Sequence, residues 1–247
     1  MKYFNMEQKD GVTEVYIYGD ITSWPWTESD VSGYTLARAL KDAEGEIIVY
    51  INSYGGEVGE ALAIYSTLRQ KAAQGAKVTT VCDGFACSAA SMVFMAGTER
   101  VMYPYSMVMI HRAWIWAAGS ADELREEADR LEKIETAAYA VYRDNIHISD
   151  DELKALLDKE TWLDAGEALE AGFSTVTRGA SGKAAARVTP VSRIAKLGDK
   201  PPEPAGTDDA EGTTPSAGGG HPSEEGNEAP FRTVLQQFMN RKGCKNA

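Results

Sequence analysis

The chain is poor in the residues that build disulfide frameworks and metal sites, with three cysteines and three histidines among 247 residues. Cys82 and Cys87 stand in apolar segments, which indicates free thiols in a reducing compartment. The histidines are His111, His147 and His221, and neither a Cys-x-x-Cys nor a His-Glu-x-x-His pattern accompanies them. We therefore expect no metal ion and no cofactor.

Positive charge is also scarce. Lys and Arg together number 25 against 37 Asp and Glu, so the formal net charge is −12. Contacts with phosphate groups need clustered basic side chains, so this balance argues against binding to nucleic acids and to anionic membrane surfaces. No run of 18 or more apolar residues occurs, and residues 1–11 lack the apolar stretch of a signal peptide. We expect a cytoplasmic protein that binds neither nucleic acid nor membranes.

Up to residue 178 the apolar residues switch between strand-like and helix-like spacing. Short apolar or alternating runs predict strands at 12–21, 46–52, 77–82, 100–103 and 107–110. Helical spacing predicts helices at 58–75, 86–96 and 121–146. Ser149 and Glu152 form a capping box that opens a further, shorter helix. This alternation predicts an α/β fold in one domain that covers residues 1–178.

The remainder of the chain has a different composition. Residues 198–230 hold six of the nine prolines, seven glycines and eight acidic residues, so we expect a disordered linker at 179–230. Residues 231–247 carry four basic side chains and no acidic one. Apolar residues at 231, 234, 235, 238 and 239 follow helical spacing, which predicts a short amphipathic helix.

Two glycine- and alanine-rich stretches follow predicted strands and open predicted helices: INSYGGEVGEA at 51–61 and GFACSAASMVFMAG at 84–97. The Gly55–Gly56 pair lets backbone N–H groups approach a ligand, which suits the oxyanion of acyl transfer. A tight turn explains the same pair equally simply. A phosphate-binding loop does not, because no GxxxxGK[ST] pattern is present.

Ser88 lies at the start of the second helix, and Ser91 lies one turn further along. Either serine fits the role of a nucleophile, and either also fits the role of a small residue that allows close helix packing. A nucleophilic serine needs a base, usually a histidine. His111 follows the apolar run at 107–110, whereas His147 and His221 fall in predicted loop and linker regions. If a histidine base exists, His111 is the leading candidate.

Four segments in order, INSYGG, GFACSAASMVFMAG, MVMIHRAW and KETWLDAGEALEAGF, resemble the Clp protease proteolytic subunit family over residues 12–177. Within that family, the segments look most like those of the Clp-like peptidases of phages and prophages, some of which act in head maturation. The resemblance implies that Ser88 is the nucleophile and His111 the general base. It places the acidic member at Glu160, where the family usually has Asp, with Asp158 and Asp164 as substitutes.

Further expectations come from the same resemblance. The N–H groups of Gly56 and Ala89 would form the oxyanion hole, and Gly55 and Trp114 would contact the substrate. The segment 112–115 would pair with a peptide as an added strand. The fold would be a spiral of repeated ββα units, with the helix at 121–146 stacking rings of a homo-oligomer.

Two departures from the family pattern bear on partners. Tyr54 replaces the usual Pro, and the N-terminal loops that engage an ATPase are very short.

The expected activity is that of a serine endopeptidase acting on protein or peptide substrates. A phage head maturation protease with capsid or scaffold partners is one setting, and a housekeeping Clp subunit with an ATPase is another. A scaffold ring with little activity is the alternative.

Two other enzyme classes share the expected fold. Peptidases with a Ser–Lys dyad do not use a histidine such as His111, which here follows the apolar run at 107–110. They also need a lysine as base, and none of the motifs contains a lysine at an obvious position. Acyl-CoA enzymes of the crotonase class use a similar oxyanion hole but do not require Ser88 and His111 together. Four of the five tryptophans, Trp24, Trp26, Trp114 and Trp116, are interpreted as core or subunit-interface residues.

Overall fold

A computed structural model describes residues 5–179 of the chain. Apart from residue 179, the predicted linker at 179–230 lies outside the described residues, as does the predicted helix at 231–247. The strands are β1 (Asn5–Lys9), β2 (Val12–Ile17), β3 (Glu46–Ser53), β4 (Lys77–Cys87), β5 (Glu99–Met102), β6 (Met107–Ile110), β7 (Thr161–Leu163) and β8 (Val176–Thr177). The helices are α1 (Gly33–Ala39), α2 (Val58–Ala73), α3 (Ala89–Phe94), α4 (Ala121–Arg143), α5 (Asp150–Asp158) and α6 (Ala165–Ala171). The predicted α/β class is confirmed.

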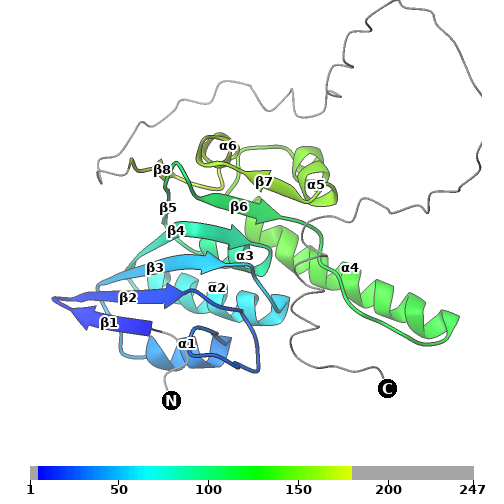
Figure 1. Ribbon diagram of the computed structural model, residues 1–247, viewed down its shortest axis with the longest axis horizontal. Helices are drawn as coiled ribbons and strands as arrows, with labels where there is room; N and C mark the ends of the chain where they lie inside the picture. The colour runs from blue at the N-terminus through cyan, green and yellow to red at the C-terminus, as the bar shows by residue number, and fades with distance from the viewer. Residues whose placement is uncertain (1–4, 180–247) are drawn as a thin grey trace, which may run out of the picture. The chain divides into compact units, whose positions relative to one another are not determined.

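All eight strands form one sheet, with the order β1-β2-β3-β4-β5-β8 and with β6 and β7 attached beside β4. Strands β2, β3, β4, β5 and β8 are parallel, and β1 is antiparallel to β2. Helices α1, α2 and α3 cover one face of the sheet (Figure 1). In the same view, α4 extends past the carboxyl ends of the central strands.

The core follows the alternation of the strands. In β2 and β3 every second side chain is buried, among them Val15, Ile17, Val49 and Ile51, and these side chains face the covering helices. Helix α3 is buried along its whole length, as its small apolar residues predict. The first helix, α1, was not predicted because only two of its seven residues, Gly33 and Leu36, are buried. Its start is stabilised by a capping box instead.

Strand β4 differs most from prediction. It continues to Cys87 instead of ending at Cys82, and α3 begins at Ala89 instead of Ala86. The first part of β4 pairs with β5, and the part from Phe85 to Cys87 pairs with β6. The second part contains Gly84 and small residues with no clear period, so only pairing with the distant β6 identifies it as a strand.

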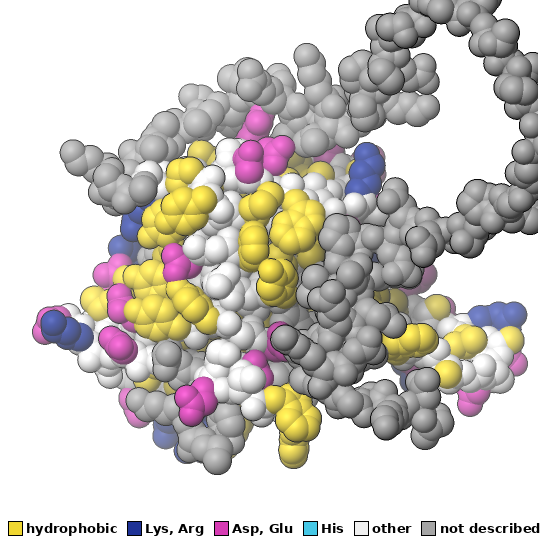
Figure 2. Space-filling model, in the orientation of Figure 1, with side chains coloured by type: hydrophobic (Ala, Val, Ile, Leu, Met, Phe, Trp, Pro, Cys, Tyr) yellow, Lys and Arg dark blue, Asp and Glu magenta, His cyan; other side chains and the backbone are white. Residues whose placement is uncertain are grey.

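The opposite face of the sheet carries aromatic rings that are half-buried or exposed. Tyr16 stacks on Tyr50 with ring centres 5.0 Å apart, and Tyr103 stacks on Tyr105 at 5.4 Å. Figure 2 shows hydrophobic side chains gathered over the strands on this face. Within residues 5–179, no helix is both long enough and apolar enough to cross a membrane.

Four of the five tryptophans are exposed, which makes the core interpretation wrong and leaves the subunit interface as a prediction. Trp24, Trp26, Trp114 and Trp116 are exposed by 70%, 72%, 52% and 85%, so none of them belongs to the core of this chain. Trp24 and Trp26 lie between β2 and α1, and Trp114 and Trp116 lie between β6 and α4.

Candidate active site

The ends of β4 and β6 bring Ser88 and His111 together. The two strands are parallel and in register, with Cys87 opposite Met109. Ser88 is the first residue after β4, and its N–H donates a hydrogen bond of 2.8 Å to the Met109 carbonyl. His111 is the first residue after β6. Because parallel strands end at the same edge of a sheet, both side chains emerge at that edge.

Glu160 reaches the same edge from the opposite chain direction. Strand β7 is antiparallel to β6, and its first residue, Thr161, pairs with Ile110. Glu160 directly precedes Thr161, so it lies beside the residue that follows Ile110, which is His111. Glu160 is half-buried and has a positive φ of 50°.

Ser88 occupies a strained junction between strand and helix. Its backbone has φ 52° and ψ −124°, a region that residues other than glycine rarely adopt. Such conformations persist only where surrounding contacts hold them, and they concentrate at functional sites. The turn directs the Ser88 hydroxyl away from the sheet and into a cavity.

The side chains of Ser88 and His111 are in hydrogen-bond contact, with 2.7 Å between Oγ and Nε2. Burial lowers the pKa of His111 below its ordinary value. The negative charge of Glu160 and a hydrogen bond to the backbone of Arg112 oppose that effect. The imidazole is therefore neutral at neutral pH, the form in which Nε2 accepts a proton.

The two alternative carboxylates have other partners. Asp158 forms an ion pair with the exposed Arg112. Asp164 caps α6, where it accepts hydrogen bonds from the N–H groups of Gly166 at 2.8 Å and Glu167 at 2.9 Å. Of the three acids, Glu160 is the one whose charge acts on the pKa of His111.

Gly55 and Gly56 lie against this junction, and the backbone requires glycine at both positions. Their φ angles are 104° and 145°. A Cβ on Gly55 would come within 2.7 Å of the Cys87 carbonyl and 2.9 Å of the Ala89 nitrogen. A Cβ on Gly56 would come within 2.0 Å of the Ile21 carbonyl. The positive φ angles support the turn interpretation of this pair, and the same turn brings the Gly55 backbone beside Ser88.

A cavity of about 360 Å³ opens beside Ser88 and His111. Its walls come from α2, α3, α4, α5 and the segment after β6. The lining residues are Val58, Ser88, Ala89, Met92, His111, Arg112, Ala113, Glu132, Glu135, Thr136, Ala138, Tyr139, Tyr142, Lys154 and Leu157. Most of these side chains are apolar or aromatic, so the cavity suits one bulky side chain of a bound peptide.

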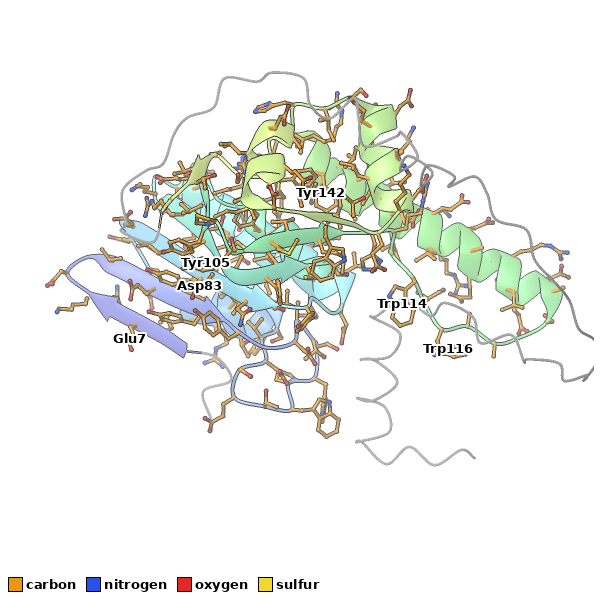
Figure 3. All side chains as sticks on the ribbon, turned by 45° about the horizontal axis from the view of Figure 1, so that its top comes forward. Glu7, Asp83, Tyr105, Trp114, Trp116 and Tyr142 are labelled. Carbon is orange, nitrogen blue, oxygen red and sulfur yellow. The ribbon has the colours of Figure 1, made fainter. Side chains whose placement is uncertain are left out.

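The predicted substrate residue Trp114 lies next to the cavity-lining Ala113, on the segment that leads from β6 to α4. Figure 3 shows Trp114 and Trp116 along this segment, apart from the more deeply placed Tyr142. The sequence does not show that α4 contributes to the cavity. Tyr142 on α4 is 51 positions from its hydrogen-bond partner Ser91, so only tertiary packing brings this helix to the site.

The described residues offer no candidate metal centre. Nowhere in residues 5–179 do three or more His, Cys, Asp or Glu side chains converge in a way that could hold an ion. Lys154 lines the cavity, but the Ser88 hydroxyl contacts His111.

Comparison with known proteins matches this architecture. A family model described as Clp protease matches residues 26–176. The ATP-dependent Clp protease proteolytic subunit of Bacteroides thetaiotaomicron is 35% identical over 150 residues, which is 60% of this chain and 67% of that protein. The proteins of the same name from Porphyromonas gingivalis and Deinococcus radiodurans are 32% identical over 150 residues and 31% identical over 152 residues. They cover 60% and 59% of this chain, and the matches span 66% and 73% of those proteins.

Proposed function

The chain belongs to the Clp protease family, and from this premise we propose that it is a serine endopeptidase that hydrolyses peptide bonds. The observation that carries the proposal is the 2.7 Å contact between Ser88 Oγ and His111 Nε2 at the mouth of an apolar cavity. A scaffold that had lost activity would have no need to keep Ser88 in a strained conformation beside a histidine.

In the proposed reaction, Ser88 attacks the carbonyl carbon of the scissile peptide bond. His111 Nε2 takes the hydroxyl proton as the new C–O bond forms, and the carbonyl electrons move onto its oxygen. The tetrahedral intermediate then expels the amine, which receives the proton from His111. Water repeats the sequence on the acyl-enzyme and restores the Ser88 hydroxyl.

Glu160 is the proposed acidic member of the triad. Its negative charge raises the pKa of His111 against the effect of burial, which stabilises the imidazolium formed during proton transfer. Glutamate is one carbon longer than the usual aspartate. The positive φ of Glu160 places the longer side chain at the start of β7, within electrostatic range of the imidazole.

The N–H groups of Gly56 and Ala89 are the proposed oxyanion hole. Ala89 opens α3 directly after Ser88, and Gly55 is close enough for a Cβ there to meet the Ala89 nitrogen at 2.9 Å. Among residues 5–179, no acceptor is hydrogen-bonded to either of these two N–H groups. Donors of this kind are available to a developing oxyanion.

Substrate binding is proposed to use both flanks of the site. Gly55 on one side and the segment 112–115 on the other would pair with an extended peptide, and Trp114 would contact a substrate side chain. The cavity would accept the side chain that precedes the scissile bond, since it opens directly at the Ser88 hydroxyl.

We also propose that copies of the chain assemble into stacked rings through α4. This helix has 23 residues, of which only Val141 and Tyr142 are buried. Leu124 and Ile134 are 43% and 40% exposed, so an apolar stripe faces outward. Sedimentation that finds only monomers at micromolar concentration contradicts this assembly.

The biological setting is also a proposal. The three relatives compared above are named as ATP-dependent, which supports a housekeeping role with an ATPase partner. Phage head maturation with capsid or scaffold partners stays a prediction from the resemblance. Coprecipitation of the full chain with host ATPases or with capsid proteins separates the two settings.

Labelling with a fluorophosphonate tests the peptidase itself. This reagent phosphonylates an activated serine, so we expect one labelled residue, Ser88, and parallel loss of peptide cleavage. Substitution Ser88→Ala should abolish labelling. A folded protein that neither reacts with the reagent nor cleaves unstructured peptides supports the scaffold alternative and contradicts the proposal.

A further inference from the structure

Two buried hydroxyl groups lie behind the Ser88 backbone. Ser91 Oγ lies 2.6 Å from the Ser88 carbonyl oxygen and 2.7 Å from the Tyr142 hydroxyl. Ser91 and Tyr142 are 0% and 3% exposed. Because each hydroxyl carries one proton and the carbonyl can only accept, Ser91 donates to Ser88 and Tyr142 donates to Ser91.

The protonation of Tyr142 agrees with this direction. Burial raises its pKa to about 12, so the phenol remains a donor throughout the neutral range. The pair therefore forms a chain of donors that starts on α4 and ends on the carbonyl of Ser88. The Ser91 N–H, at 2.9 Å, is a second donor to the same carbonyl.

The Ser88 carbonyl shares a peptide plane with the Ala89 N–H, the proposed oxyanion donor. In a trans peptide the C=O and N–H bonds point in opposite directions. Hydrogen bonds that hold the carbonyl toward Ser91 therefore aim the Ala89 N–H the other way, toward the cavity that Ala89 lines. They also hold the ψ angle of −124° at Ser88.

Resting on the proposed function, we propose that Ser91 and Tyr142 are positioning residues that orient the Ser88–Ala89 peptide for catalysis. Without the Ser91 hydroxyl, the Ser88 carbonyl keeps the hydrogen bond from the Ser91 N–H alone, and the Ser88–Ala89 peptide plane can rotate more freely. The Ala89 N–H then no longer has a fixed direction relative to the developing oxyanion. Such a loss acts on the transition state and should lower kcat with little change in KM.

A purely structural role is the competing explanation, because serine side chains in helices often bond to a carbonyl one turn back. Three variants separate the two roles: Ser91→Ala, Tyr142→Phe and the double variant. Ser91→Ala leaves the buried Tyr142 hydroxyl without its acceptor, which destabilises the fold. The double variant removes both hydroxyls, so it should regain stability while the Ser88 carbonyl still lacks the hydrogen bond from the Ser91 hydroxyl.

We expect Ser91→Ala to lower kcat about five- to tenfold, the size of one hydrogen bond, with KM changed less than about twofold. The fluorophosphonate labelling rate should fall by the same factor. Tyr142→Phe should lower kcat about two- to threefold, because Ser91 keeps its bond to Ser88. The double variant should have the kcat of Ser91→Ala.

Thr80→Val is the matched control. Thr80 is buried, and its hydroxyl donates a 2.7 Å hydrogen bond to the Phe94 carbonyl at the other end of α3. This variant should lose stability and keep wild-type kcat.

Recovery of wild-type kcat in the double variant, or wild-type kcat in Ser91→Ala, overturns the positioning role. If Ser91→Ala does not fold, the double variant still decides the question. Ser88→Ala is measured alongside these variants. Full activity in Ser88→Ala contradicts the peptidase mechanism itself, whereas an inactive Ser88→Ala with an unaffected Ser91→Ala contradicts only this inference.

Discussion

The polar groups at the two ends of α3 differ in burial, because Arg100 is buried whereas Ser88 and His111 are half-buried. Beyond its C-terminal end, the guanidinium of Arg100, 6% exposed, donates to the carbonyls of Phe173 at 2.8 Å and Gly172 at 3.0 Å. It also donates to the carbonyls of Gly97 at 3.1 Å and Asn145 at 3.5 Å. These carbonyls lie at or just past the C-terminal ends of α3, α4 and α6, where helix dipoles favour a cation.

At the N-terminal end of α3 the polar groups face a cavity instead. The Ser88 hydroxyl contacts one imidazole nitrogen at 2.7 Å, and the pKa of that imidazole is lowered by its own burial. Arg100 has a partner for each donor nitrogen and thereby fastens three helix ends together. Ser88 and His111 line the cavity, so a substrate can reach both side chains, as a reaction at this site requires.

The largest expected effect is at the cavity end. Ser88→Ala should lower peptidase activity by about three orders of magnitude or more, because no other group replaces the activated hydroxyl. Its free energy of unfolding should stay within about 1 kcal/mol of wild type. Cleavage of a fluorogenic peptide and urea unfolding measure the two quantities. Ser106→Ala, which removes a buried hydroxyl between β5 and β6, is the control that should keep activity.

Glu160→Gln should lower kcat by about two to four orders of magnitude while the protein stays folded, because the imidazolium loses its counter-charge. Peptide kinetics with circular dichroism provide the measurement. Asp158→Asn should have a far smaller effect, since the Asp158–Arg112 pair is exposed. A larger loss in Asp158→Asn or Asp164→Asn would move the acidic role away from Glu160.

Arg100→Met should act in the opposite way, on stability rather than chemistry. Several buried carbonyls lose their donor, so we expect a loss of about 3–5 kcal/mol in the free energy of unfolding. The fraction that remains folded should keep a kcat near wild type. Arg125→Met is the control, because Arg125 is 73% exposed and its ion pair with Asp122 contributes little. Equal losses in both variants would remove the contrast between the two ends of α3.

The pH dependence sharpens the contrast further. Because burial lowers the pKa of His111, the imidazole loses its proton below its ordinary pKa of about 6.5. We expect kcat/KM to rise with pH through an apparent pKa below about 6.5 and then to level off. In Glu160→Gln the midpoint should move to lower pH, because the charge that raises the pKa is gone. A midpoint above that of free histidine would contradict the assignment of His111.

The smallest expected effect comes from removing the tail. Every residue assigned to the site lies between Gly55 and Glu160, inside the described residues. A chain that ends at residue 180 should therefore fold and cleave a short peptide at about the wild-type rate. Association with the natural partner should be lost if residues 231–247 form the predicted amphipathic helix and its apolar face binds that partner. Loss of short-peptide cleavage would make the tail part of the catalytic unit.

Local sequence patterns were sufficient for much of the fold. Alternation in β2 and β3 predicts their buried faces, since side chains on a strand point to opposite faces in turn. Helical spacing predicts α2 and α4, although α4 ends at Arg143 rather than at residue 146. The Ser149–Glu152 capping box predicts the start of α5. The order of the four motifs identified Ser88 and His111 as the candidate nucleophile and base, because only a few residue types serve in these roles.

Tertiary structure alone decided how these pieces meet. Pairing of β4 with β6 puts Ser88 beside His111, and antiparallel β7 returns Glu160 to the same edge. The Ser91–Tyr142 contact joins residues 51 positions apart, and it leaves no local periodicity for a sequence to display. Composition likewise did not predict that Trp24, Trp26, Trp114 and Trp116 are exposed. Strand pairing and burial depend on contacts between distant segments, whereas capping, alternation and helical spacing depend only on neighbours along the chain.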